Sequence, residues 1–430
     1  MFCNQCEQTS HGVGCVSTPG VCGKDEDVQS LQEILLYGLK GMAAYANHAR
    51  RLGKTDENVS AFIEEALFAT MTNVNFDTGS LLEMVMECGK QNLRVMELLD
   101  EAHVERFGHP SPTIVKEGTQ AGPGILITGH DLLDLANLLK QCEGTAVKVY
   151  THGEMMPAHM YPRLREHPNL AGHFGGAWQK QKTEFEAFTG PTLATTNCIL
   201  IPRPSYADRL FTTRCTAVPG GTRLTSDDFS AVIAKAKQCE PLQDKPEKQS
   251  TVGFHHDVIL GAADAVVKGV KEGKIRRFFL IGGCDGAEVG RNYFSEYARS
   301  TPSDTFILTL GCGKFRIRDH EYGELIGLPR LLDMGQCNNA YGAIKVAVAL
   351  AGAFNCTVND LPLTLVVSWF EQKAVAVLLT LLSLGVKGIT IGPAAPGFIS
   401  PGVFKILKEN FDLRIAGKDA QADLAMAMAG

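Results

Sequence analysis

Four cysteines lie within the first 22 residues of this 430-residue chain: Cys3, Cys6, Cys15 and Cys22. Few apolar side chains separate them, so the segment has little from which to build a hydrophobic core. Cys3 and Cys6 form one CxxC pair, but a zinc ribbon normally has two such pairs, and a compact run of four thiols is more typical of iron–sulfur ligation. We expect an iron–sulfur cluster here, with zinc as the alternative, because a bound metal would replace the missing core.

A second set of metal-binding side chains follows the apolar runs of the chain. Six such runs each end beside one of these residues: His130, Glu154, Cys284, Cys312, Cys337 and Glu371. If the runs are strands of parallel sheets, their carboxyl ends share one edge, where ligands usually bind. Cys198 is the exception, because TTNCILIP predicts a strand over 198–202, which does not precede the cysteine.

Each of these residues also has a simple structural interpretation. An isolated cysteine is often just a small buried side chain, and His130 could be a turn residue before a helix capped by Asp131. However, the sequences GGC, GC and GQC place glycine close to three of the cysteines, and glycine lets the backbone approach a bulky group. Glu154 and Glu371 stand among apolar residues, where a buried carboxylate is costly unless it is paired or bound to metal. This thiol-rich set of N, O and S ligands favours iron and sulfur over calcium or magnesium.

The elements that must position these residues fall into three regions. Helical periodicity and charged helix ends predict helices over 25–51, 56–73 and 79–107, which together form a small bundle. After a Gly- and Pro-rich stretch, 108–124, apolar runs alternate with helical ones in a βαβ rhythm, which a polar stretch at 240–250 divides. We predict a multidomain α and α/β protein. Its parts are an iron–sulfur loop with a three-helix bundle over 1–115, and two Rossmann-like α/β domains over 116–250 and 251–430.

The composition argues against several functional classes. A net charge of −6 leaves no broad basic surface, so we expect no nucleic acid partner. The longest uncharged apolar run, 374–386, is shorter than the about 20 residues that cross a bilayer, so we expect a buried helix there and no membrane span. No secretion signal is recognisable, which predicts a cytoplasmic protein whose thirteen cysteines are free or bind metal.

Motifs along the whole chain resemble the hybrid-cluster protein family, also called the prismane protein family and often named hydroxylamine reductase. They are MFCNQCEQT, ITGHD, THGEMMPAHMYP, TTNCILIP, IGGCDGAEVGRNYF, LTLGCGKFR, MGQCNNAYGA and SWFEQKA. Longer members of the family have a second helical bundle before the α/β domains. Here only 108–124 joins the first bundle to those domains, so the chain resembles the short form of the family.

The resemblance implies ligands for two clusters. The four N-terminal cysteines would hold a 4Fe–4S cluster, or a 2Fe–2S cluster, because the spacing from Cys15 to Cys22 is looser than expected for the cubane type. A hybrid 4Fe–2O–2S cluster would be held by His130, Glu154, Cys198, Cys284, Cys312, Cys337 and Glu371. Cys284 would carry an extra sulfur as a persulfide. Lys373 would lie near this cluster, where we expect its ammonium group to pair with a carboxylate.

The same resemblance implies an oxidoreductase that reduces hydroxylamine with two electrons and two protons to ammonia and water. Glu154, Glu371, Lys373 or His152 would supply protons if burial brings their pKa values toward neutrality. The alternatives are a nitric oxide reductase or protein S-nitrosylation factor, a nickel-containing relative of carbon monoxide dehydrogenase, and a non-catalytic electron carrier or structural zinc protein.

Two partners are expected besides the small-molecule substrate. No G-x-G-x-x-G motif follows an expected strand, so electrons would come from a separate ferredoxin-like or flavin-bearing donor. The missing second bundle would leave one face of the protein open. A homodimer that covers this face is therefore a further hypothesis.

Overall fold

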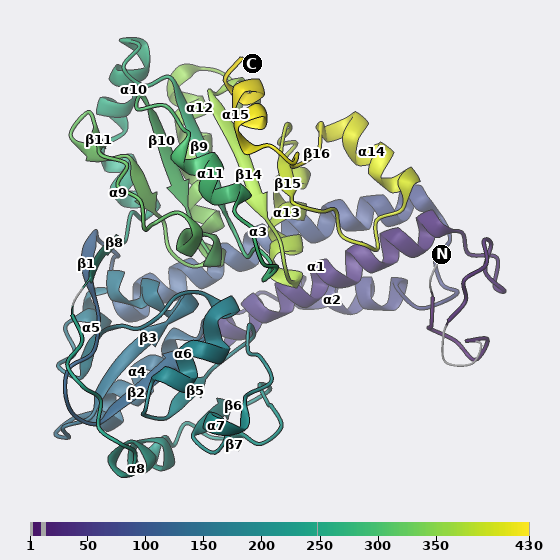
Figure 1. Ribbon diagram of the computed structural model, residues 1–430. Coiled ribbons are helices and arrows are strands. Elements are labelled where there is room, and N and C mark those ends of the chain that lie inside the picture. The colour runs from purple at the N-terminus through teal and green to yellow at the C-terminus, as the bar shows by residue number, and fades with distance from the viewer. Residues whose placement is uncertain (1–2, 10–13, 247, 430) are drawn as a thin grey trace.

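The computed structural model describes residues 3–9, 14–246 and 248–429, and its first part is a three-helix bundle (Figure 1). The helices are α1 (Glu26–Arg51), α2 (Glu57–Ala69) and α3 (Thr78–Phe107). An aspartate caps each helix: the carboxylates of Asp25, Asp56 and Asp77 accept hydrogen bonds from backbone N–H groups of the first turn. The predicted bundle is confirmed, although α2 ends at Ala69 and not at residue 73.

The first α/β unit contains a sheet of eight strands within the described residues. In chain order these are β1 (Thr113–Glu117), β2 (Gly124–Thr128), β3 (Lys148–His152), β4 (Leu170–His173), β5 (Thr192–Ala194), β6 (Leu210–Thr213), β7 (Thr222–Leu224) and β8 (Lys248–Val252). Their spatial order is β7–β6–β5–β2–β3–β4–β1–β8, and all neighbours are parallel except the antiparallel pair β1 and β8. The connecting helices are α4 (Leu132–Cys142), η2 (Gly153–Met160), α5 (Pro162–Arg165), η3 (Trp178–Lys180), α6 (Gln181–Ala187), α7 (Pro204–Ala207) and α8 (Ser230–Gln238), where η marks a 3-10 helix.

The second α/β unit contains a six-stranded parallel sheet in the described residues. In chain order its strands are β9 (Arg277–Gly283), β10 (Thr305–Thr309), β13 (Leu331–Asp333), β14 (Leu363–Ser368), β15 (Thr390–Gly392) and β16 (Arg414–Ile415). Their spatial order is β13–β10–β9–β14–β15–β16, and β11 (Glu324–Leu325) pairs separately with β12 (Leu328–Pro329). The helices are α9 (His256–Gly261), α10 (Ala263–Lys271), α11 (Tyr293–Arg299), η4 (Cys312–Arg316), η5 (Cys337–Asn339), α12 (Ala340–Phe354), η6 (Val358–Asp360), α13 (Gln372–Ser383), α14 (Pro401–Phe411) and α15 (Ala420–Ala429).

Helix α13 connects the bundle to the second sheet by packing against both α1 and α3. Glycines allow this close approach: a Cβ at Gly89 would lie 2.1 Å from the carbonyl oxygen of Leu379. The buried helix predicted over 374–386 is therefore confirmed. Among the described residues, no helix is both long and apolar enough to cross a membrane. Figure 1 shows the N-terminal loop at the end of α1 that points away from the first sheet.

The predicted fold class is confirmed, but two strand assignments differ from the structure. Residues 198–202 form no strand; the strand is β5, and Cys198 follows it with a φ of 64°, outside the range of extended backbone. The stretches 108–124 and 240–250, interpreted as breaks between domains, contain β1 and the start of β8. β8 is an edge strand and β1 is its neighbour; both are short, contain charged residues and have one buried position each, so their apolar pattern is weak. The domain limits stay a prediction.

Candidate metal centre

The expected ligands lie after the carboxyl ends of neighbouring strands in both sheets. In the first sheet, adjacent strands β5, β2 and β3 precede Cys198, His130 and Glu154. In the second sheet, adjacent strands β13, β10, β9 and β14 precede Cys337, Cys312, Cys284 and Glu371. Cys198, predicted to precede a strand, is thus no exception.

Short distances connect the contributions of the two sheets. Glu154 Oε2 accepts a hydrogen bond from the backbone N–H of Cys337 at 3.0 Å and lies 3.9 Å from His130 Nε2. One ligand atom from each of these three residues lies within 4.8 Å of the other two. Cys284 Sγ lies 3.9 Å from Glu371 Oε1. The structure therefore brings His130, Glu154 and Cys337 together and places Cys284 beside Glu371.

Cys198 and Cys312 approach the same region from different sheets. Both contact a small apolar cluster that includes Trp178. Burial, and then the negative charge of Glu371, raises the pKa of Cys198. Burial, and then the negative charge of Glu154, raises the pKa of Cys312. Each thiol therefore lies within electrostatic range of one of the two carboxylates.

Glycines turn the chain sharply before these ligands. A glycine with positive φ directly precedes four of them and stands two residues before a fifth: His130, Glu154, Cys284, Cys312 and Cys337. The tightest case is Gly283, which has a φ of 109° and where a Cβ would lie 2.0 Å from the carbonyl oxygen of Ser368. Any other residue would push the ends of β9 and β14 apart and move Cys284 away from Glu371.

The donor set is largely buried, and burial disfavours the charged forms of its carboxyl and thiol groups. Burial raises the pKa of Glu154 to about 7, although Lys314 and the N–H of Cys337 act in the opposite direction. Burial likewise raises the pKa of Cys337 to about 11. Glu154 Oε1 is buried without a hydrogen-bond partner among the described residues. A multiply charged metal assembly would supply the missing positive charge and keep the thiols as thiolates, so these residues fit an iron–sulfur–oxygen cluster.

His130 is positioned as a neutral imidazole. Burial lowers its pKa well below the ordinary value, and the charge of Lys373 acts in the same direction. Its Nδ1 shares a 2.9 Å hydrogen bond with Thr196 Oγ1, which leaves Nε2 on the side of Glu154. The Gln336 side chain donates hydrogen bonds to the carbonyl oxygens of His130 and Glu154, at 3.1 and 2.6 Å. Fixing the second ring nitrogen in this way is usual for a metal-binding histidine.

Lys373 lies beside the centre but does not form the predicted ion pair. Its side chain is buried, and Nζ has no hydrogen-bond partner among the residues that the structure describes. Burial lowers its pKa, but the charges of Cys337 and Glu371 raise it overall. The prediction of a direct Lys373–carboxylate pair is wrong, because Glu371 instead caps α13 by accepting from the backbone N–H of Lys373 at 3.2 Å.

Residues from distant parts of the chain also support the centre, and local sequence patterns do not reveal them. Tyr45 in α1 donates its O–H to Cys337 Sγ at 3.0 Å, and Lys373 Nζ lies 5.8 Å from the centroid of the Tyr45 ring. Helical periodicity marks such a tyrosine as a core residue and carries no sign of this contact.

Both ring nitrogens of His152 form hydrogen bonds, Nδ1 with Thr128 Oγ1 at 3.1 Å and Nε2 with Glu184 Oε2 at 2.9 Å. His152 is therefore committed to hydrogen bonds within the first α/β unit.

An apolar cavity of about 260 Å³ adjoins the centre in the second α/β unit. It lies between strands β9, β10 and β14 and the helices α9, α10, α12 and α13. Its lining includes the buried thiols Cys284 and Cys337 and also the exposed side chains Val348 and Leu384. The cavity therefore extends from the centre toward the surface.

The N-terminal cysteine loop lies at the start of α1. Two backbone hydrogen bonds, of 3.2 and 2.6 Å, pair Cys3 with Cys15. Cys3 is buried, whereas Cys6 and Cys22 are exposed. The buried ammonium group of Lys24 lies 3.9 Å from Cys3 Sγ.

A model of the Prismane/CO dehydrogenase family matches residues 1–84 and 77–424. The chain belongs to this family. It is 58% identical to "Hydroxylamine reductase" of Moorella thermoacetica, over 96% of this chain and 97% of that protein. It is 47% identical to "Hydroxylamine reductase" of Methanothermobacter thermautotrophicus, over 99% of both chains. The protein of the same name from Rhodospirillum rubrum is 54% identical over 94% of this chain but only 73% of its own length.

These matches confirm the predicted membership in the prismane family and its short form. The two segments matched by the Prismane/CO dehydrogenase family overlap at 77–84, at the start of α3. Carbon monoxide dehydrogenase IV from Carboxydothermus hydrogenoformans has a TM-score of 0.81 at 15% identity, covering all of this chain and 92% of the other. Carbon monoxide dehydrogenase from Thermococcus sp. AM4 has a TM-score of 0.80, also at 15% identity, covering all of this chain and 90% of the other. At this identity the likeness shows the fold alone.

Proposed function

We propose that this protein reduces hydroxylamine to ammonia and water, with two electrons and two protons, at an iron–sulfur–oxygen cluster. The observation that carries the proposal is the set of seven N, O and S donors on neighbouring strand ends of two facing units. Relatives named hydroxylamine reductase, which are 47–58% identical over nearly the whole chain, support it.

The two clusters are assigned to ligands by their family motifs. The hybrid 4Fe–2O–2S cluster takes His130, Glu154, Cys198, Cys284, Cys312, Cys337 and Glu371. Cys284 carries the persulfide sulfur. The loop ligands Cys3, Cys6, Cys15 and Cys22 hold a 4Fe–4S cluster or, given the loose Cys15–Cys22 spacing, a 2Fe–2S cluster.

The chain's own residues manage protons and charge at the centre. When bound, the hybrid cluster supplies electrons and a Lewis acid. Glu154 and Glu371 are the carboxylates that can hold protons for the leaving oxygen, and Glu154 Oε1 has no other partner among the described residues. Lys373 keeps its positive charge within electrostatic range of the ligands and stabilises negative charge that develops there.

Nitric oxide is the second candidate substrate, and the apolar cavity favours it. A cavity lined by aliphatic side chains suits a small neutral molecule with little polarity, whereas hydroxylamine would lose hydrogen bonds to water on entering it. Comparison of the turnover rates with nitric oxide and with hydroxylamine separates the two. A faster rate with nitric oxide would make nitric oxide reduction, or protein S-nitrosylation, the main function.

A homodimer would bring the two kinds of cluster closer together. The loop lies at the N-terminal end of α1 and Tyr45 near its C-terminal end, about 30 Å away at 1.5 Å per residue. This separation is too long for one efficient electron-transfer step. Apolar residues around the loop and the α2–α3 turn are exposed: Val16, Val21, Phe68, Met71 and Phe76. A second copy of the chain would cover these residues and bring its own N-terminal loop near the centre of the first copy. A separate ferredoxin-like or flavin-bearing donor in the cytoplasm would supply the electrons. Light scattering that finds a monomer at micromolar concentration would remove the dimer.

Substitution of the two carboxylates tests the proposed function. Glu154→Ala and Glu371→Ala should lower hydroxylamine reduction at least about 100-fold, because each removes a ligand and a proton carrier. The N-terminal cluster should keep its absorption spectrum, and Glu87→Ala, a partly exposed carboxylate on α3, should retain full activity. Unchanged activity in both centre variants would refute the ligand assignment. Elemental analysis should find iron without nickel or stoichiometric zinc.

A further inference from the structure

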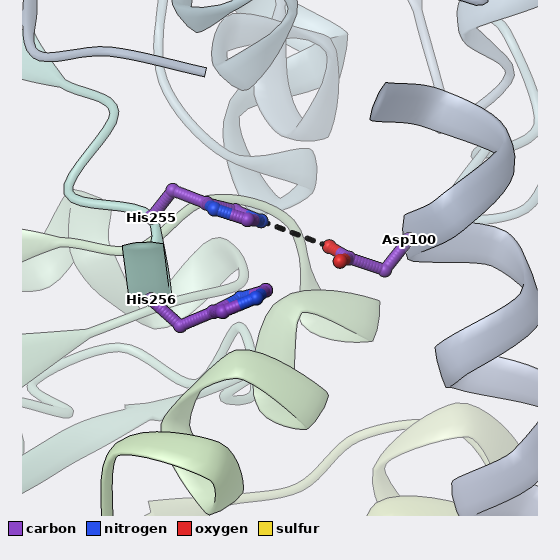
Figure 2. Close-up of side chains that lie close together, drawn as sticks. All are labelled: Asp100, His255 and His256. Atoms are coloured by element: carbon purple, nitrogen blue, oxygen red, sulfur yellow. Dashed lines mark hydrogen bonds and ion pairs between the residues drawn. The ribbon is translucent and has the colours of Figure 1, made fainter. Parts of the chain in front are cut away.

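Asp100, His255 and His256 form a second cluster of metal-binding side chains, separate from the centre described above (Figure 2). Asp100 lies in the C-terminal half of α3, while His255 caps α9 and His256 begins it. Each of the three residues is at most 5% exposed. One ligand atom from each lies within 4.8 Å of the other two. In Figure 2 both imidazole rings point toward the carboxylate.

The ring nitrogens are supported as in a metal site. His255 Nε2 forms a 3.1 Å hydrogen bond with Asp100 Oδ1. Its Nδ1 accepts a 3.4 Å hydrogen bond from the backbone N–H of Asp257 and also lies 3.4 Å from Asp257 Oδ2. His256 Nε2 lies 3.4 Å from Asp257 Oδ1, while its Nδ1 is buried without a hydrogen-bond partner among the described residues. A carboxylate behind the ring is the usual support of a metal-binding histidine. A buried nitrogen with no partner is costly unless a ligand binds there.

Charge and space also suit a divalent cation. The carboxylates of Asp100 and Asp257 together balance a double positive charge. A Cβ at Gly342 would lie 3.0 Å from His256 Nδ1, so a side chain at this position would crowd the nitrogen. Asp257 is about half exposed, which gives an ion a path from solvent.

We propose that Asp100, His255 and His256 bind a divalent transition-metal ion, with water completing the coordination. Two imidazoles and one carboxylate are a ligand set that Zn²⁺ and Fe²⁺ accept. Metal–ligand bonds of about 2.0–2.2 Å place ligand atoms roughly 3.4 Å apart, close to the 3.1 Å between His255 and Asp100. On binding, the proton on His255 Nε2 moves to Nδ1, where Asp257 Oδ2 lies 3.4 Å away, so Nε2 is free for the metal and no net proton is released.

The ion would tie the helical bundle to the second α/β unit. Asp100 belongs to α3 and the histidines to α9, and α12 packs against both helices. The 3-10 helix η5, which carries Cys337, also packs against α3. The bound ion therefore stabilises the packing of α3 against η5, which carries Cys337, and does not contact the cluster ligands. The proposal does not depend on the substrate of the enzyme.

Zinc binding to the full-length protein, with its iron–sulfur clusters in place, tests the proposal. Isothermal titration calorimetry should give one Zn²⁺ per chain with micromolar or tighter affinity. Asp100→Asn and His256→Gln should each weaken binding at least about 100-fold. His109→Ala removes an exposed histidine 3.6 Å from Asp257 and should leave binding unchanged.

Two further measurements separate loss of binding from loss of folding. The variants should keep the cluster absorption and the far-UV circular dichroism of the wild type, and His256→Gln decides if Asp100→Asn is misfolded. X-ray absorption at the zinc edge should find two imidazoles and oxygen ligands without sulfur. The proposal is overturned if the wild type binds no zinc at submillimolar concentration, if the folded variants bind it as tightly, or if the ligands are sulfur.

Discussion

The N-terminal cysteine loop and the buried centre present similar ligands on very different scaffolds. In the loop, Cys6 and Cys22 are exposed, and the regular structure among its described residues is the backbone pair of Cys3 with Cys15. At the centre, each ligand follows a strand that is hydrogen-bonded to its neighbours, and most ligands are buried. We therefore expect the loop to depend on the proposed metal for its conformation, whereas the sheets would hold the proposed ligands of the centre before metal binds.

Removal of iron should have the largest effect, and it should divide the two regions. A structural metal site contributes on the order of 10 kcal/mol to the folding of the segment that holds it. After anaerobic chelation, amides of residues 3–9 and 14–22 should therefore exchange with solvent as fast as in an unfolded chain. Amides of β9 and β10 should stay protected. Hydrogen-exchange mass spectrometry measures both regions in one experiment.

Single cysteine variants provide the control. Cys6→Ser in iron-loaded protein should reproduce the fast exchange of the loop, while Cys215→Ser, an exposed cysteine outside both regions, should not. Equal loss of protection in the loop and in the strands would end the distinction between them.

Gly283→Ala should damage the preorganised centre more than a comparable glycine elsewhere. The new methyl group would lie 2.0 Å from the Ser368 carbonyl oxygen, and the residue would remain in the left-handed region. Overpacking and backbone strain together should cost about 2–5 kcal/mol, and the hybrid cluster should be lost in part. Thermal unfolding followed by circular dichroism, with the iron content of the centre, measures the effect.

Gly273→Ala is the matched control for this prediction. Gly273 has a φ of 70°, but no heavy atom lies within 4 Å of the position that a Cβ would take there, so its substitution adds strain of about 1–2 kcal/mol without a clash. If the two variants lose the same stability and iron, close approach at Gly283 does not position Cys284.

The smallest effect concerns the pH dependence of the scaffold around the centre. Burial lowers the pKa of His103 on α3 from 6.5 to about 3, so the unfolded chain binds its proton at a higher pH than the folded chain. The contribution is fully present above pH 6.5 and is lost progressively between pH 6.5 and 3, by up to about 1.4 kcal/mol per pH unit. The melting temperature should therefore fall from pH 7 to pH 5. His103→Phe should reduce this fall, whereas His109→Phe, at an exposed position, should not.

Local patterns in the sequence were enough to predict the helices, the central strands and the order of the ligands. Apolar runs such as those of β2 and β10 are buried along their whole length, which is why they stand out without an alignment. Glycine beside the expected ligands was also a valid signal, because it marks the sharp turn after each strand. Burial and chain turns are properties of a few consecutive residues.

Contacts between distant residues could not be predicted in this way. The hydrogen bond from Tyr45 to Cys337 and the cluster of Asp100 with His255 and His256 join segments that are far apart in the chain. The edge strand β8 and its neighbour β1 were missed because short, polar strands with one buried position each resemble loops. The predicted ion pair of Lys373 was wrong for a similar reason. Glu371 caps α13 by accepting from the backbone N–H of Lys373, and this contact depends on three-dimensional geometry.

An anaerobic crystal structure with iron anomalous scattering tests the central claim most directly. The claim is that seven side chains between residues 130 and 371 surround one iron assembly at the ends of two sheets. We expect one strong iron peak in contact with His130, Glu154, Glu371 and the four cysteines, and a second peak at the N-terminal loop. A map without iron between Glu154 and Glu371, or with these carboxylates far apart, would contradict the claim.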